Sequence, residues 1–138
     1  MLKNLYHAIV GDPDAKRARR MLPVVAKINA YETEYQRLSP ETLQAKTEEF
    51  KEIIRAFLKP YQTEYNQVKA HLESPQIWND SEQKKLVQGE LHEKKIILNK
   101  KTREITTEIL PQAFALVKNA CRRLCGTKIT VKGKEQTW

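Results

Sequence analysis

A long run of apolar residues at steps of three and four constrains this chain more than any other feature of its sequence. The run consists of Phe50, Ile54, Phe57, Tyr61, Tyr65, Val68 and Leu72. Such spacing places all of them on one face of a helix and predicts a seam that packs against a second helix. Pro60 falls inside the run, so we expect a kink or a short break there.

A second, sparser seam follows and predicts the partner helix. Its members are Val87, Leu91, Leu98, Ile105 and Ile109, with Lys94 and Thr102 filling the gaps. Ser74-Pro75 ends the first helix, and Asn79-Asp80-Ser81-Glu82 is a capping sequence that starts the second. Two amphipathic helices joined by a short turn lie antiparallel, so we expect a helical hairpin over residues 51–109.

The flanking segments also favour helices. Over residues 12–50, Asp12-Pro13 and Ser39-Pro40 are helix starts, and Pro23 should kink the first helix. Its apolar stripe consists of Ala18, Met21, Leu22, Val25 and Ile28. Over residues 110–138, Leu110-Pro111 indicates a helix boundary. A last helix should then place Phe114, Val117, Cys121 and Leu124 together and stop at Gly126, before one short strand over residues 127–132. The predicted fold class is all-α, with kinked helices, a long antiparallel hairpin and a short C-terminal strand.

The net charge of +8 is concentrated at the two ends of the sequence. Residues 1–20 carry five basic and two acidic side chains, residues 111–138 carry six and one, and the middle is neutral. Basic ends attract phospholipid headgroups, nucleic acid or acidic protein surfaces. The sequence contains no run of 18 apolar residues that could span a bilayer, and it shows no secretion signal. We therefore expect a cytoplasmic chain.

Residues 1–11 form an amphipathic segment with a basic cluster close behind it, which indicates binding to an anionic membrane surface or to a partner. The candidate residues are Leu2, Lys3, Leu5, Tyr6, Ile9, Lys16, Arg17, Arg19 and Arg20. The alternative is a terminal segment that docks on the protein itself.

Catalytic and cofactor sites are not predicted. The chain has no glycine-rich phosphate loop, and its three histidines lie apart from other metal ligands, so we expect no nucleotide, metal or catalytic site. Arg122 and Arg123 between Cys121 and Cys125 could activate a thiol, but packing of both cysteines in the last helix is the favoured interpretation. Nucleic acid is not an expected partner because no binding module is visible.

Three blocks of sequence resemble the start of SecA, the motor of bacterial protein translocation. They are the segments 21–30, 38–50 and 110–124, which read MLPVVAKINA, LSPETLQAKTEEF and LPQAFALVKNACRRL. The corresponding family patterns are approximately PIV..IN, LSDEELRAKTAEF and LPEAFAVVREAARR. The last block, with its cysteine, is most similar to SecA from chlamydia-like bacteria.

The resemblance implies an ATP-driven enzyme that binds acidic phospholipid and the SecYEG channel and exports preproteins from the cytoplasmic face of the inner membrane. In that family the GEGKT phosphate loop follows the third block. ATP and magnesium are therefore implied for downstream ATPase domains of a parent protein, while this segment should carry neither.

The chain departs from the family pattern between the second and third blocks. About fifteen residues usually join them, whereas sixty positions separate Phe50 from Leu110. The extra residues are those of the predicted hairpin, which we expect to project as an arm for a partner rather than to fold back on the scaffold. Its seam could also bury Tyr61 and Tyr65 in a homodimer. A function from a different class is a free-standing basic adaptor for anionic protein or RNA surfaces.

Overall fold

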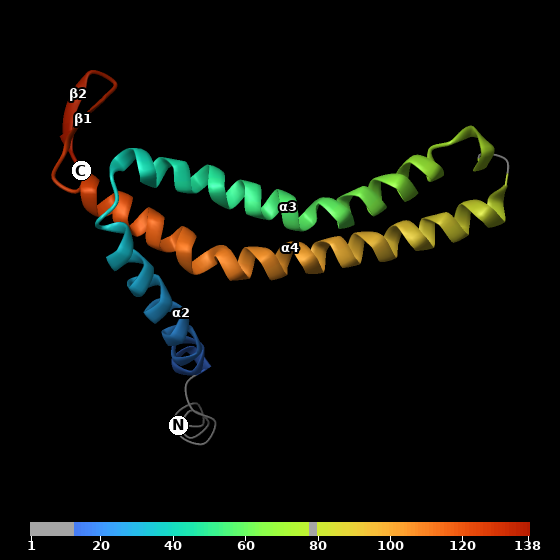
Figure 1. The fold of residues 1–138 in the computed structure, drawn as a ribbon, viewed down its shortest axis with the longest axis horizontal. Coiled ribbons are helices and arrows are strands. Elements are labelled where there is room, and N and C mark those ends of the chain that lie inside the picture. The colour runs from blue at the N-terminus through green and yellow to red at the C-terminus, as the bar shows by residue number, and fades with distance from the viewer. Residues whose placement is uncertain (1–12, 78–79) are drawn as a thin grey trace, which may run out of the picture. The chain divides into compact units, whose positions relative to one another are not determined.

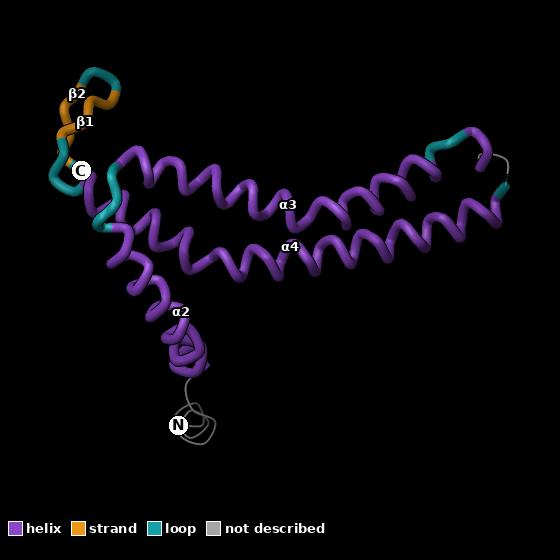
Figure 2. The backbone as a smooth tube through the Cα atoms, in the orientation of Figure 1, coloured by secondary structure: helices purple, strands orange, loops and turns teal. Residues whose placement is uncertain are grey.

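The described part of the chain folds into three long helices followed by a small sheet (Figures 1 and 2). The computed structural model describes residues 13–77 and 80–138. The elements are α2 (Pro13–Tyr35), α3 (Pro40–Leu72), the 3-10 helix η1 (Pro75–Ile77), α4 (Ser81–Leu124), β1 (Lys128–Val131) and β2 (Lys134–Thr137). The predicted helical class, with its hairpin and C-terminal strand, is confirmed.

Side-chain caps explain where the helices begin and end. The Ser39 Oγ accepts a hydrogen bond from the Thr42 N–H at 3.2 Å at the start of α3. The Asp80 carboxylate accepts the N–H groups of Glu82 and Gln83 at 3.1 and 2.9 Å at the start of α4. Gly126 follows the end of α4 with a φ of 80°, a conformation that costs glycine little. The predicted starts and stop are therefore confirmed locally.

The chain divides into two compact units, which we describe separately. The hairpin unit comprises Gln44–Leu110, and the scaffold unit combines the chain up to Leu43 with Pro111–Trp138. In the hairpin unit, both predicted seams are buried or half-buried. The seam members with the least exposure are Phe50, Val87, Ile105 and Ile109, and Ile77 of η1 is buried as well.

Polar and cationic side chains complete the hairpin seam where apolar residues are missing. The Lys94 Nζ lies 2.8 Å from a carboxylate oxygen of Glu64 on the opposite helix. The Lys101 Nζ lies 5.9 Å from the ring centre of Phe57 and 5.6 Å from that of Tyr61, within the range of cation–π attraction. The Lys101 Nζ also pairs with Glu104 of its own helix at 2.8 Å. Because both lysines contact groups of the opposite helix at the edge of the seam, both positions help to fix the register of the two helices.

Prolines do not break the helices. Pro60 lies inside α3, which bends along its length in Figure 1 but stays continuous. The expected boundary at Leu110-Pro111 is wrong, because α4 runs through Pro111 to Leu124. A proline inside a helix costs about 3 kcal/mol and one backbone hydrogen bond. Pro111 is itself buried, as are Ile109 and Ala115 on either side, so packing outweighs the local cost.

The core of the scaffold unit lies between α2, the first turn of α3 and the C-terminal part of α4. Tyr35, Leu43 and Ala115 are buried there. The half-buried residues packed around them are Ile28, Tyr31, Leu38 and Leu116. These residues come from all three SecA-like blocks or from the chain between them, so segments far apart in the sequence share one core.

The C-terminal segment forms a two-stranded antiparallel hairpin, whereas the sequence predicted a single strand. Lys128 of β1 pairs with Thr137 of β2, and Val131 pairs with Lys134. Lys132 and Gly133 connect the strands with φ angles of 52° and 77°. Two consecutive residues with positive φ suit a tight hairpin turn. In the sequence, the Lys132-Gly133 pair is the signal for a turn into a second strand. The side chains of β2 are all exposed.

The hairpin seam should dominate the stability of its unit. Ile105 is 4% exposed, so Ile105→Ala should lower the free energy of unfolding by about 2–5 kcal/mol, because it removes buried methylene groups and leaves a cavity. Ile96, on the same helix, is 54% exposed, so Ile96→Ala should change the free energy of unfolding by about 0.5 kcal/mol or less. Urea unfolding followed by circular dichroism measures both; equal losses would contradict the assigned seam.

Candidate functional site

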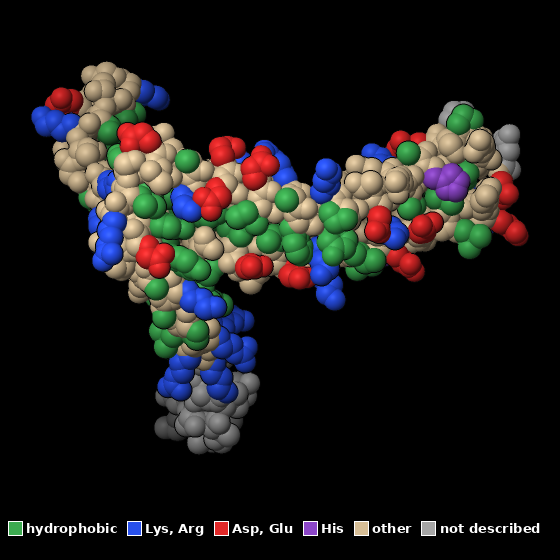
Figure 3. Space-filling view, in the orientation of Figure 1, with side chains coloured by type: hydrophobic (Ala, Val, Ile, Leu, Met, Phe, Trp, Pro, Cys, Tyr) green, Lys and Arg blue, Asp and Glu red, His purple; other side chains and the backbone are tan. Residues whose placement is uncertain are grey.

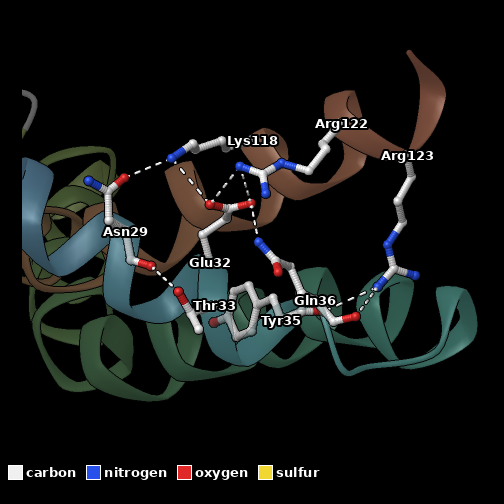
Figure 4. A network of polar contacts seen from close by, with 8 residues as sticks. All are labelled: Asn29, Glu32, Thr33, Tyr35, Gln36, Lys118, Arg122 and Arg123. Atoms are coloured by element: carbon white, nitrogen blue, oxygen red, sulfur yellow. Dashed lines mark hydrogen bonds and ion pairs between the residues drawn. The ribbon is translucent and has the colours of Figure 1, made fainter. Parts of the chain in front are cut away.

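A buried carboxylate joins α2 to α4 in the scaffold unit (Figure 4). Glu32 of α2 is 3% exposed. Its carboxylate oxygens lie 3.0 Å from the Arg122 guanidinium and 3.2 Å from the Lys118 Nζ, and one accepts a hydrogen bond from the Gln36 amide at 3.1 Å. Lys118 also donates to the Asn29 side-chain oxygen at 2.7 Å. We call these five residues the polar joint.

The spacing of the polar joint follows from helix geometry. Asn29, Glu32 and Gln36 are three and four residues apart on α2, and Lys118 and Arg122 are four apart on α4. Residues at these separations lie on one face of a helix. Each helix therefore presents one polar stripe to the other. The Glu32 side chain is 5% exposed, whereas those of Lys118 and Arg122 are 43% and 56% exposed. Loss of these partners would leave the buried carboxylate without compensation, so the joint favours one alignment of the two helices.

The pKa of Glu32 is lowered from its usual value of 4.5. The hydrogen bond from Gln36 is the largest cause, and the hydrogen bond and charge of Lys118 and the charge of Arg122 act in the same direction. Burial alone would raise the pKa. The carboxylate is thus held in its charged form by its neighbours.

Arg123 caps the C-terminal end of α2. One guanidinium nitrogen lies 3.1 Å from the carbonyl oxygen of Tyr35, 3.3 Å from that of Gln36 and 2.7 Å from that of Leu38. The last carbonyl groups of a helix have no partner within it and carry partial negative charge. A cation from α4 therefore closes α2 and fixes the turn into α3.

The basic residues predicted to bind a membrane or partner lie together on the first turns of α2. Lys16, Arg17, Arg19 and Arg20 are all exposed, and Arg17 lies 3.7 Å from Asp14. Figure 3 shows basic side chains gathered on this part of α2. The remaining predicted members, Leu2, Lys3, Leu5, Tyr6 and Ile9, lie outside the residues that the structure describes.

Three apolar residues of the predicted stripe lie beside this basic cluster and are exposed. Met21, Leu22 and Val25 are 58%, 62% and 44% exposed. Of that stripe, Ile28 does pack against the core. The N-terminal part of α2 therefore presents apolar and basic side chains to solvent together.

Two further expectations need correction. Cys121 and Cys125 are exposed rather than packed within the last helix. Tyr61 and Tyr65 are half-buried within their own hairpin, so the homodimer interpretation loses the exposed tyrosines on which it rested.

Among residues 13–77 and 80–138, no three histidine, cysteine or acidic side chains are placed to hold a metal ion. Depressions of about 560 and 310 Å³ lie along single helices of the hairpin unit and are open to solvent. Nucleotide phosphates are usually held by a glycine-rich loop at a helix start, which this chain lacks. No helix in the described part is long and apolar enough to cross a membrane.

Glu32 should make the stability of the fold depend on pH in the acidic range. A carboxyl group with a lowered pKa stabilises the folded state above its unfolded pKa, and this stabilisation is lost as pH falls through the lower folded value. Glu32→Gln should therefore lower the urea midpoint at neutral pH, and its difference from the parent chain should shrink below pH 4.5. Glu34→Gln removes an exposed carboxylate from the same helix and is the control. A difference independent of pH would argue against the ion pairs.

Arg123 should stabilise the fold through the geometry of its guanidinium group as well as through its positive charge. Arg123→Ala removes the charged donor from three carbonyl groups, of which that of Tyr35 keeps the Leu38 N–H, and should cost about 1.5–3 kcal/mol of unfolding free energy. Arg123→Lys should cost less, since one amine can still reach a carbonyl but cannot reproduce the guanidinium geometry. Lys128→Ala, in an exposed ion pair with Glu135, should be nearly neutral. Denaturant unfolding of the three variants provides the ranking, and a neutral Arg123→Ala would refute the cap.

Comparison with known proteins supports the resemblance carried by the three sequence blocks that contribute to the scaffold core. The model of the SecA DEAD-like domain matches residues 6–132. The protein translocase subunit SecA 1 of Chlorobium chlorochromatii is 31% identical over all 138 residues, and SecA of Chlorobium limicola is 32% identical over the same length. SecA of Chloroherpeton thalassium is 33% identical over 94% of the chain. No solved structure matches.

The matches refine two expectations. They extend over the whole chain, so the hairpin lies inside the region shared with these relatives. A chlamydia-like source is not supported, because the reported relatives come from Chlorobium, Prosthecochloris and Chloroherpeton. The chain spans about 13% of the length of the first two relatives. Since the family model covers nearly all of it, this chain belongs to the SecA family.

Proposed function

We propose that this chain is the N-terminal helical segment of a SecA-type preprotein translocase and that it attaches the motor to an anionic membrane surface and to the SecYEG channel. The family match supports the class of protein. The relatives are named protein translocase subunits, which supports a role in protein export. In this role the protein is peripheral on the cytoplasmic face of the inner membrane.

The observation that carries the attachment role is the exposed face at the start of α2. Four basic residues, Lys16, Arg17, Arg19 and Arg20, are followed within five positions by the exposed apolar side chains of Met21, Leu22 and Val25. Apolar side chains can enter the headgroup region of a bilayer while basic ones pair with anionic lipid. Each basic residue near such a surface contributes about 1 kcal/mol.

ATP hydrolysis belongs, in this proposal, to domains of the parent enzyme beyond the described helices. Those domains would bind ATP and magnesium and drive preproteins through the channel. The present residues contribute a scaffold: the polar joint, with Glu32 at its centre, aligns α2 with α4, and Arg123 fixes the turn between α2 and α3. In this proposal, a rigid scaffold lets the membrane attachment transmit force from the motor to the channel.

The hairpin, residues 51–109 in the predicted division of the chain, is proposed to be an arm that binds a partner. Its buried side chains follow one seam, and its exposed side chains are mostly charged or polar, although Ile53, Leu86, Ile96 and Ile97 are exposed too. The adaptor hypothesis is not favoured, because the family model extends across both the scaffold and the hairpin.

Vesicle flotation tests the attachment role. Replacing Lys16, Arg17, Arg19 and Arg20 by glutamine should weaken binding to vesicles of phosphatidylglycerol and phosphatidylcholine at least about tenfold, because four charges of about 1 kcal/mol each are lost. Binding of the parent chain should also fall with added salt.

The control removes the same charge from the hairpin unit. Its four substitutions are Lys84→Gln, Lys85→Gln, Lys95→Gln and Lys100→Gln, all at exposed positions. This variant should bind nearly as well as the parent chain. Similar loss in both variants would mean that net charge, not the α2 surface, controls binding, and no loss in either would exclude an anionic membrane as the target of α2.

A further inference from the structure

The first half of α4, in the hairpin unit, carries a second regular stripe of side chains on its outer side. The stripe consists of Leu86, Gly89, Glu93, Ile96, Lys100 and Arg103, at steps of three, four, three, four and three. This is the spacing of a seam between two helices. All six residues are exposed, and the side chains of Leu86 and Ile96 are 75% and 54% exposed. We call these six residues the second stripe.

The second stripe faces away from the seam that the hairpin already uses. The residues that α4 buries or half-buries in this region include Val87, Leu91, Lys94 and Leu98. Because an α-helix has 3.6 residues per turn, this inner set and the second stripe lie on opposite sides of it. Figure 1 shows α3 running along one side of α4. The outer side of an amphipathic helix normally carries polar side chains, so regularly spaced leucine and isoleucine there indicate a further contact.

The charge of α4 changes sign along the same stretch. Residues 80–93 contain four acidic and two basic side chains, whereas residues 94–103 contain five basic and no acidic ones. When two such helices lie antiparallel, the acidic part of each faces the basic part of the other. A parallel pair would instead place like charges together. The outer side of α4 is therefore complementary to a second copy of itself in the antiparallel orientation.

We propose that the second stripe is an interface through which two copies of this chain pair, with α4 of one copy antiparallel to α4 of the other. The inference rests on the arm of the proposed function and names its partner. It uses the outer side of α4 and leaves Tyr61 and Tyr65 in the inner seam. The two copies are related by a two-fold axis, so every contact occurs twice.

The spacing of the second stripe selects the register of the pair. With the two-fold axis level with the turn between Gly89 and Glu93, the two stripes face each other along their length, and Leu86 of each copy lies opposite Ile96 of the other. Ile96 lines an open depression of about 310 Å³ on α4, which Leu86 of the other copy would enter. At the axis, Gly89 lies opposite Glu93. No atom of the described chain lies within 4 Å of the position that a Cβ on Gly89 would take, so the longer side chain has room there.

The same register pairs opposite charges. Glu82 of each copy lies opposite Lys100 of the other, and both side chains are exposed. Among residues 13–77 and 80–138, neither of these two side chains forms an ion pair within the chain. A shift by one heptad loses the match, because it places Glu82 opposite Glu93 in one direction and Lys100 opposite Gly89 in the other. The contact from Glu82 to Lys100 covers about 27 Å of helix, which is short for a specific interface, so dimers should form with a Kd in roughly the micromolar range.

Sedimentation velocity of the 138-residue chain tests the pairing, with a reductant present so that Cys121 and Cys125 cannot link copies. The mass should rise from 16.1 kDa towards twice that value between about 1 and 100 μM. Glu82→Lys and Lys100→Glu should each raise the Kd at least about tenfold, because each places like charges together at two symmetric contacts. Lys59→Glu makes the same charge change at an exposed position of α3 and should leave the Kd unchanged.

Mixing the two charge-reversed variants provides the sharpest test. The Glu82→Lys chain has lysine at both positions and the Lys100→Glu chain has glutamate at both, so each variant repels its own copies. In an equimolar mixture every contact between these positions again joins opposite charges, and a heterodimer should form with about the Kd of the parent chain. Circular dichroism of each variant checks that its helices are intact.

A polar substitution tests the apolar part of the interface. Leu86→Ser should weaken pairing at least about tenfold, because it removes an apolar side chain from both symmetric contacts. Ile53→Ser changes an apolar residue of α3 that is 43% exposed and should have no effect on the Kd.

The outcomes separate the inference from the proposed function. A chain that stays monomeric up to about 100 μM overturns the inference, and so does a dimer that neither charge reversal weakens. Equal weakening by Lys59→Glu would mean that net charge controls association and would overturn it as well. A mixture that associates no better than its components excludes the register. None of these results affects the attachment role, which vesicle flotation of the α2 variant tests independently.

Discussion

The scaffold unit depends on one buried carboxylate that is paired with cations and hydrogen-bond donors. Glu32 is buried, and Lys118, Arg122 and Gln36 surround it with donors. A charge in such a place is tolerated only while it stays paired, so the pairing selects one alignment of α2 against α4. Arg123, one position further on α4, then closes the end of α2. Alignment and closure together bring Tyr35, Leu43 and Ala115 into one core.

The hairpin unit depends on a different constraint, continuous apolar contact along two helices. Where its second seam lacks an apolar residue, Lys94 pairs with Glu64 and Lys101 lies over the rings of Phe57 and Tyr61. Long side chains of this kind can cover apolar surface and still place a charge at its edge. The seam therefore continues through both positions, and a one-turn slip would separate Lys94 from Glu64 and Lys101 from the two rings.

The functions proposed for this chain rest on surfaces of its helices. The first turns of α2 combine basic and apolar side chains, a combination that suits an anionic membrane. These turns belong to a helix that the polar joint aligns with α4. In the proposed role, this surface attaches an export motor to the membrane.

Local patterns in the sequence determined the helices, their caps and the hairpin seam, because spacing along one helix decides which side chains share a face. The family blocks also identified the class of protein. Tertiary structure decided the rest. Glu32 meets Lys118 and Arg122 across more than eighty residues, which no local pattern predicts. Packing around Pro111 kept α4 continuous where local preference indicated a boundary. The sequence placed Met21 and Phe114 in apolar stripes, but it did not determine that both side chains are exposed, because burial depends on which partner reaches each helix face.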